Sequence, residues 1–175
     1  AVFPVFTHQV AFAVDAGFPR MFVAGIFGLP GFMSSIGRIV FGTISDWVGR
    51  ESAATLSFAC TAAGTVALLL LEVWPHTGWL YAYALLFGLG FGARGPIITA
   101  MVAELFAGRR FGVIYGIMNL GNGVGGALGP LFGGVVHDLT GSYRLAFLTA
   151  VGFSGVAAAC FWIARPRKTG TRRLS

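Results

Sequence analysis

Residues 21–50 read MFVAGIFGLPGFMSSIGRIVFGTISDWVGR. Positions 21–44 are apolar, small or hydroxyl-bearing apart from Arg38, and a charged, turn-forming stretch follows at 45–50. A helix needs about 20 predominantly apolar residues to cross a bilayer core of roughly 30 Å. We therefore expect a membrane-spanning helix over 21–44 that ends in a short polar loop.

The rest of the chain has the same apolar character. Hydrophobic residues make up 56% of it and charged residues 10%, with a mean hydropathy of +0.80, whereas soluble domains carry about 25% charged residues. Strands of a membrane barrel are about half the length of these apolar runs. We expect an all-α membrane protein, a helix bundle over 1–164, with spans at 1–14 (partial), 21–44, 52–73, 79–101, 111–136 and 144–164.

Segment 1–14 is too short to cross a bilayer. It has no basic start and no small-residue cleavage site of the kind that marks a signal peptide. We expect it to be the outer part of a first helix that begins before Ala1.

Positive charge is unevenly distributed along the chain. The net charge is +6, and a basic tail over 165–175 carries five of the twelve Lys and Arg residues. Together with Arg50, Arg109 and Arg110, the tail gives one side of the bundle eight basic residues. The opposite side has two, Arg20 and Arg144. Because basic loops stay in the cytoplasm, we expect a cytoplasmic C-terminus in a plasma (inner) membrane, with anionic lipid rather than nucleic acid near the tail.

Glycine and proline are placed where helices would pack and bend. Gly121, Gly125, Gly129 and Gly133 recur every fourth residue, which predicts a smooth ridge for close helix packing in lipid. The spans at 21–44, 79–101 and 111–136 are interrupted by Pro30, Pro96 and Pro130, respectively. Broken, glycine-rich helices favour a protein that moves over a simple anchor.

The loop at the end of span 21–44 carries the pattern G-x-x-x-D-x-x-G-R, formed by Gly42, Asp46, Gly49 and Arg50. In physical terms, Gly42 allows close packing, Asp46 can cap or pair, Gly49 allows a tight turn, and Arg50 can meet an acid or a helix C-terminus. The pattern resembles the loop between helices eight and nine of major facilitator superfamily transporters. An ordinary cytoplasmic turn is the alternative reading.

Later stretches are similar to helices ten to twelve of the same superfamily. The string Gly-Ala-Arg-Gly-Pro occurs at 92–96, Gly-Gly-Ala-Leu-Gly-Pro at 125–130, and Asp-Leu-Thr-Gly-Ser-Tyr at 138–143. The ending resembles the monocarboxylate-porter and oxalate:formate-antiporter branch. The resemblance implies the six-helix C-terminal half, helices seven to twelve with the first incomplete, of a twelve-helix fold that works by alternating access.

Two arginines lie inside expected spans. An intramembrane Arg costs a few kcal/mol or more, so it should face a cavity and be paired or used. The resemblance implies that Arg38 meets a substrate carboxylate, while snorkelling or a bridge to Asp46 is the alternative. Arg94 is expected to bind the same anion, to gate it, or to cap carbonyls freed at Pro96.

Three polar residues of segment 111–136, namely Tyr115, Asn119 and Asn122, share one helix face roughly opposite the glycine ridge. They are expected to face a pore, or to link helices. His8 is a titratable candidate for binding substrate or a proton, or a structural histidine. Oxalate:formate antiporters carry an essential lysine in the helix that corresponds to segment 111–136. This segment has no lysine, which argues against oxalate as the substrate.

Acidic residues occur only near the ends of the expected spans. Glu104 with Arg109 or Arg110 is expected to form a cytoplasmic ion-pair latch. If protons are the coupling ion, an intramembrane carboxylate would have to come from the missing N-terminal half of the transporter.

The function expected from these features is secondary transport of a small monocarboxylate or dicarboxylate through a lipid bilayer. A transporter of the same superfamily for a drug or sugar, and a non-transporting membrane assembly subunit, are the alternatives. The motifs H-E-x-x-H and G-x-S-x-G are absent. We therefore expect no enzyme activity, and no metal or cofactor.

Overall fold

The computed structural model describes residues 2–105 and 111–163. It is built from helices, and no β-strand occurs in these two ranges, which confirms the all-α class. The elements are α1 (Phe3–Asp15), α2 (Arg20–Ile26), α3 (Leu29–Val48), α4 (Arg50–Leu69), the short 3-10 helix η1 (Leu70–Glu72), α5 (Thr77–Leu105), α6 (Phe111–Thr140) and α7 (Arg144–Ile163).

Four segments of the described chain are long and apolar enough to cross a membrane, at Arg20–Val48, Arg50–Glu72, Thr77–Glu104 and Arg144–Ile163. α6 has 30 residues but is not among them. Its many glycines and two asparagines lower its hydropathy. α1 has 13 residues, fewer than a span requires.

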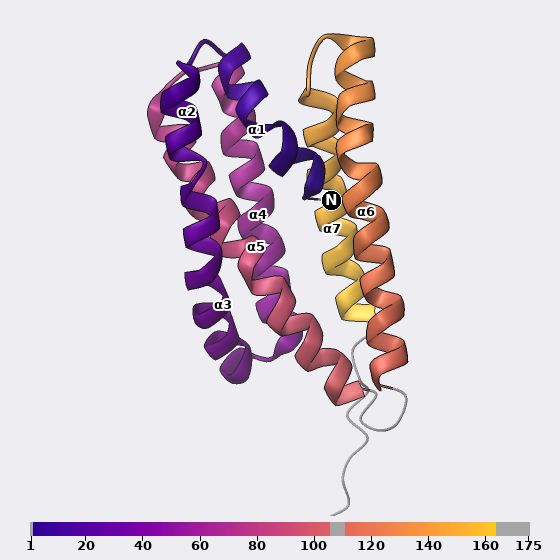
Figure 1. Cartoon of the computed structure of the whole chain (residues 1–175). Helices are drawn as coiled ribbons and strands as arrows, with labels where there is room; N and C mark the ends of the chain where they lie inside the picture. The colour runs from indigo at the N-terminus through magenta and orange to yellow at the C-terminus, as the bar shows by residue number, and fades with distance from the viewer. Residues whose placement is uncertain (1, 106–110, 164–175) are drawn as a thin grey trace, which may run out of the picture.

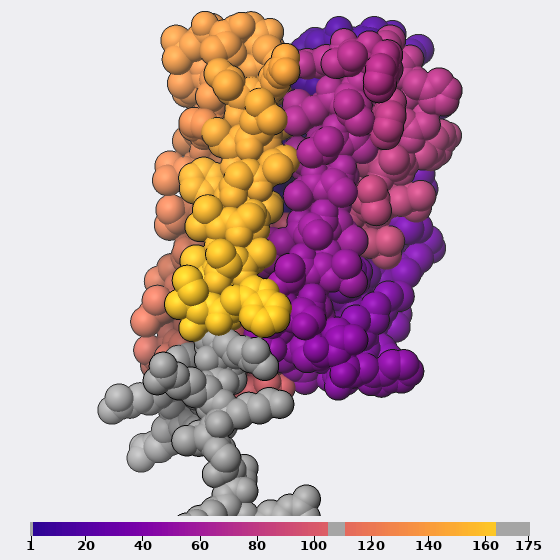
Figure 2. Space-filling view, turned by 180° about the vertical axis from the view of Figure 1, so that it is seen from behind, coloured from indigo at the N-terminus to yellow at the C-terminus, as the bar shows by residue number. Residues whose placement is uncertain are grey.

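The helices form two groups that lie side by side. Figure 1 shows α6 and α7 as an antiparallel pair next to α3, α4 and α5, with α1 between the groups near one end. Seen from behind in Figure 2, α7 lies along the group that contains α4. Trp162 near the end of α7 donates from Nε1 to the Thr55 hydroxyl of α4 at 2.9 Å, which ties the two groups together.

The three prolines have different effects on their helices. Pro30 stands in the first turn of α3, just after the break at Phe27–Gly28 that separates α2 from α3. Pro96 and Pro130 lie inside α5 and α6, which continue through them. The expected interruption of the helix thus occurs only at Pro30, where the missing N–H falls in a first turn that does not need it.

Close helix packing centres on α5. A Cβ added at Gly88 would lie 2.7 Å from both Pro30 O and Met33 Cβ of α3, and one at Gly64 of α4 would lie 2.7 Å from Phe87 N. The backbones of α3, α4 and α5 therefore touch directly, as small residues allow in membrane bundles.

The predicted glycine ridge of α6 is used over part of its length. A Cβ at Gly129 would lie 3.0 Å from Phe3 Cβ, and one at Gly133 2.7 Å from His8 Cδ2, so both glycines face α1. Gly121 and Gly125 have no such neighbour within 4 Å in the described residues. Among the described residues α1 packs against only one end of the predicted ridge, and a packing role for Gly121 and Gly125 stays a prediction.

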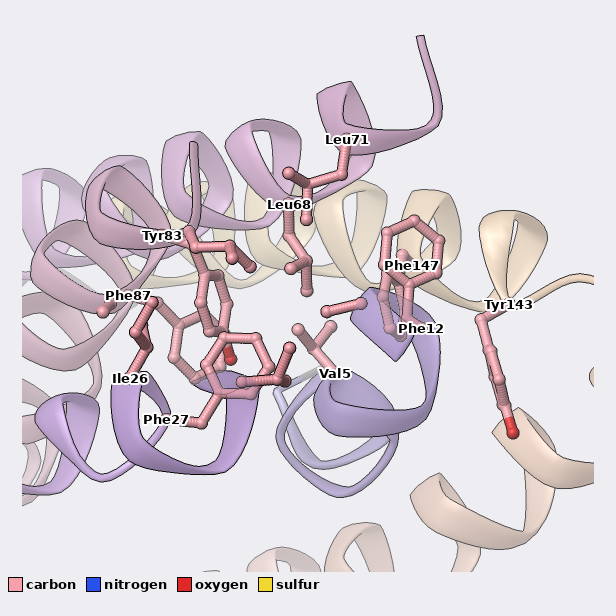
Figure 3. Packing of buried hydrophobic residues seen from close by; sticks show 14 of the residues in the cluster. Val5, Phe12, Ile26, Phe27, Leu68, Leu71, Tyr83, Phe87, Tyr143 and Phe147 are labelled. Carbon is pink, nitrogen blue, oxygen red and sulfur yellow. The ribbon is translucent and has the colours of Figure 1, made fainter. Parts of the chain in front are cut away.

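A buried apolar cluster fills the end of the bundle where α1, α2, α4, α5 and α7 meet. Tyr83, Phe87, Leu68 and Phe147 are fully buried in it, and Figure 3 shows their side chains converging from several helices. A smaller cluster near the other end joins α3, α4 and α5 around Phe58.

Candidate functional site

A pocket of about 530 Å³ lies where the start of α1, the middle of α3, the second half of α5 and the first half of α6 meet. This volume falls within the range of small-molecule sites. Its wall includes five of the six residues that the sequence predicted for substrate binding, namely Arg38, Arg94, Tyr115, Asn119 and Asn122.

Arg38 stands on α3 with its side chain exposed toward this pocket. Within the described residues it has no hydrogen bond or ion pair. The alternative bridge to Asp46 is not formed among the described residues, where the Asp46 carboxylate pairs with Arg50 at 2.7 Å. The Arg38 guanidinium therefore keeps its donors available for a bidentate anion.

Arg94 is held in place by side chains of α4. Its Nη2 donates to the Thr61 hydroxyl at 2.5 Å, and its guanidinium carbon lies 4.6 Å from the centre of the Phe58 ring. The Thr61 oxygen lies 3.0 Å from the carbonyl of Phe58, to which its hydroxyl donates. Among the described residues Arg94 makes no hydrogen bond to a carbonyl freed at Pro96. Its contacts with Thr61 and Phe58 fix the orientation of its guanidinium, which lines the pocket.

One donor of Arg94 remains without a partner. Its Nε is buried and makes no hydrogen bond in the structure. A buried unpaired donor costs about 1–3 kcal/mol, so the guanidinium is only partly satisfied by the protein.

The polar residues of α6 face the pocket from the opposite wall. The Thr99 hydroxyl of α5 lies 3.4 Å from the Tyr115 hydroxyl, and Asn119 donates from Nδ2 to the Tyr115 carbonyl of its own helix at 3.0 Å. Neither Asn119 nor Asn122 hydrogen-bonds another helix in the described part of the chain. Both amide groups are exposed, so they present polar atoms to the pocket and do not link helices here.

His8 lies away from the pocket. Its Nε2 is 3.0 Å from the Pro130 carbonyl, and its ring stacks on Tyr143 with 4.7 Å between ring centres. The structure therefore separates His8 from the five pocket residues with which the sequence grouped it.

The loop motif is organised around Arg50. Its guanidinium donates to Asp46 at 2.7 Å, to Ser45 Oγ at 2.7 Å and to Glu104 of α5 at 3.0 Å. Gly49, between α3 and α4, has φ +92°, a conformation that glycine adopts without strain. Among the described residues Gly42 has nothing within 4 Å of an added Cβ, so close packing at this glycine stays a prediction.

The expected ion-pair latch joins Glu104 to Arg109 or Arg110. Both arginines lie outside the described residues. In the described part, Glu104 pairs with Arg50. The carboxylate side chains are 63% exposed at Asp46 and 53% at Glu104. Each pair is therefore worth about 1 kcal/mol or less.

The sequence did not indicate Thr61, Phe58 or Thr99 as partners of the site. Hydroxyl and aromatic residues are common in membrane helices, and only the approach of α4 to α5 brings Thr61 and Phe58 to Arg94. The position of Arg94 along its own helix gives no information about how closely α4 approaches α5.

Comparison with known proteins gives a consistent result. Residues 74–175 match the sequence pattern of the Major Facilitator Superfamily. The chain is 28% identical over 148 residues to monocarboxylate transporter 13 of Rattus norvegicus, covering 85% of this chain and 34% of that protein. It is 27% identical over 154 residues to human monocarboxylate transporter 2, covering 87% of this chain and 32% of that protein.

A bacterial relative matches to a similar extent. An uncharacterized MFS-type transporter of Bacillus subtilis strain 168, YcxA, is 28% identical over 154 residues, which cover 86% of this chain and 37% of that protein. The chain spans about a third of the length of each of these relatives.

Proposed function

Because this chain belongs to the Major Facilitator Superfamily, a family of membrane transporters, we propose that it forms the C-terminal half of a secondary transporter for a small carboxylate. The observation that carries the proposal is the free guanidinium of Arg38 in a pocket that also holds Arg94. Two cations in one pocket of a membrane bundle favour an anionic ligand, since each is costly there without one.

The pocket residues divide the work of binding in this proposal. Arg38 meets the carboxylate with two parallel hydrogen bonds, and Arg94 adds a fixed positive charge from α5. Tyr115, Asn119 and Asn122 of α6 offer hydrogen bonds to polar groups on the rest of the ligand. The apolar wall, with Phe91, Ile98 and Met118, accommodates a short carbon chain.

An N-terminal half of the same transporter would cover the exposed side of Arg38, Asn119 and Asn122 and complete the cavity. This part of the proposal is supported by the length of the relatives, about three times that of this chain. Transport would proceed by alternating access, as the two halves rock about the pocket.

We further propose a plasma-membrane location with the C-terminus in the cytoplasm, and protons as the coupling ion.

The test is transport by the full-length protein with Arg38→Ala. We expect uptake of the transported carboxylate to fall at least about tenfold, because a hydrogen bond to a charged group contributes about 1.5–3 kcal/mol. Initial uptake rates at several concentrations, with equal amounts of protein in the membrane, provide the measurement.

Arg20→Ala is the matched control, because Arg20 is an exposed arginine at the start of α2 and does not line the pocket. It should transport at the wild-type rate. Unchanged uptake kinetics in Arg38→Ala would contradict the proposed role of this residue.

A further inference from the structure

Three aromatic rings from three parts of the chain are stacked at the end of the bundle remote from Arg50. The Tyr143 ring, just before α7, stacks on both His8 of α1 and His137 of α6, with ring centres 4.7 and 4.2 Å away. Both pairs are close to parallel, at 25° and 20°. Figure 3 shows Tyr143 at the edge of the apolar cluster, with its hydroxyl directed away from Leu68 and Phe147.

The stack connects α1 to α6 at two levels. At the inner level, His8 Nε2 donates to the Pro130 carbonyl at 3.0 Å, and Gly133 makes room for the imidazole. At the outer level, His137 Nε2 lies 4.0 Å from the Asp15 carboxylate at the end of α1. The end of α6 is thus joined to α1 through both histidines.

His137 lies among groups that favour a positive charge. Besides Asp15, the Asp138 carboxylate is 3.8 Å from His137 Nδ1. The face of the Tyr143 ring attracts a cation by its quadrupole. Each of these three interactions strengthens when the imidazole gains a proton, and those with Asp15 and Tyr143 connect α6 to other elements.

Three other ionisable side chains belong to elements at this end of the bundle. Glu72 of η1 accepts from the Ser142 hydroxyl at 3.3 Å and forms no ion pair with His137 in the described residues, Arg144 begins α7, and His8 stacks on the same Tyr143 ring as His137. Burial, with the charges of Asp15 and Asp138, raises the pKa of the Tyr143 hydroxyl. Tyr143 therefore stays neutral throughout the range in which imidazoles titrate.

We propose that His137 is a proton-binding site that fastens α6 to α1 and α7 when the solution at this end of the bundle is acidic. Imidazole changes charge between about pH 5 and 8. The pairs with Asp15 and Asp138 join opposite charges only when the imidazole carries a proton. The side chain of His137 is 33% exposed, so protons reach it directly from solution.

The experiment measures the separation of α6 from the start of α2 by pulsed electron paramagnetic resonance in the full-length protein. Spin labels are placed at Met21 in α2 and Leu139 in α6, whose side chains are 87% and 81% exposed. The free thiols Cys60 and Cys160 are replaced by serine, with any other cysteines of the protein. Distances are recorded at pH 5.5 and pH 8.0.

We expect the distance distribution of the labelled protein to be narrower at pH 5.5 than at pH 8.0. His137→Gln should give the same broad distribution at both pH values. His76→Gln is the matched control, because His76 is an exposed histidine whose Nδ1 accepts from the Gly78 N–H and which has no carboxylate partner among the described residues. That variant should keep the full pH response.

Asp15→Asn provides a second variant in case His137→Gln does not fold, since Asp15 is exposed at a helix end. It should reduce the narrowing at pH 5.5. A distribution that does not change with pH, or a response that survives in His137→Gln, would overturn the proposal. The readout does not depend on any transported substrate, so it is independent of the proposed transport function.

Discussion

The two arginines of the pocket differ in how the protein holds them. Arg38 is exposed and has no protein partner among the described residues, whereas Arg94 is tied to Thr61 and lies over Phe58. A guanidinium with free donors can follow a moving ligand, whereas an anchored guanidinium keeps its positive charge at one position in the pocket. In our proposal the pair therefore combines a ligand-binding cation, Arg38, with a static one, Arg94.

The anchoring of Arg94 can be tested at Thr61. Thr61→Val removes the acceptor of the Arg94 Nη2 donor while keeping the shape of the side chain nearly unchanged. Since Arg94 Nε already lacks a partner, we expect a loss of about 1.5–3 kcal/mol in stability, the value of a hydrogen bond to a charged group. The melting temperature of the full-length protein in detergent measures this loss.

Thr65→Val is the control for this substitution. Thr65 is also buried in α4, but its hydroxyl donates only to the Thr61 carbonyl, at 2.9 Å. It should melt close to the wild type. Equal melting temperatures for the two variants would show that Thr61 does not anchor Arg94.

Among the helices, the contact between α3 and α5 positions both arginines, because Arg38 comes from one helix and Arg94 from the other. Gly88 and Gly92 of α5 and Gly37 of α3 bring these backbones together. A side chain at any of these positions would push the two helices apart and widen the pocket between them.

Gly88→Ala should therefore destabilise the protein. Its Cβ would meet Pro30 O and Met33 Cβ at 2.7 Å, and backbone atoms cannot move aside cheaply. We expect a loss of about 1–3 kcal/mol, as for other overpacked positions, measured by thermal unfolding in detergent.

Gly95→Ala, in the same helix, has nothing within 4 Å of the added Cβ and should be neutral or slightly stabilising. If Gly88→Ala were as stable as Gly95→Ala, the close α3–α5 approach would be contradicted.

The helices were predictable from sequence because an apolar run of about 20 residues has few alternatives in a bilayer. Their ends were less so: α6 continues to Thr140 and α5 to Leu105, since polar residues prolong a helix into the interface. Within the site, the shared face of Tyr115, Asn119 and Asn122 follows from helical period. The pairings of Arg94 with Thr61, Arg50 with Glu104 and His8 with Tyr143 depend on how helices pack, which spacing along one helix does not specify.

The molecule as a whole exposes apolar side chains on many sides, including Ile39, Trp47, Val113, Leu120 and Leu131, each more than 60% exposed. Such a surface is stable in lipid, as expected of an integral membrane protein. The polar groups of Arg38, Asn119 and Asn122 are also exposed, but they gather in one pocket. In our proposal lipid covers the apolar faces and the N-terminal half covers the pocket.

The most direct test of this account is uptake by the purified full-length protein in liposomes, comparing a short monocarboxylate with its primary amide. The two probes have nearly the same size and differ in charge, so a pocket built around Arg38 and Arg94 should distinguish them. We predict saturable uptake of the carboxylate, at least about tenfold faster than uptake of the amide, and further accelerated by an inward proton gradient. Equal uptake of both probes, or uptake of neither above that of empty liposomes while a neutral sugar or a drug enters, would contradict the carboxylate pocket.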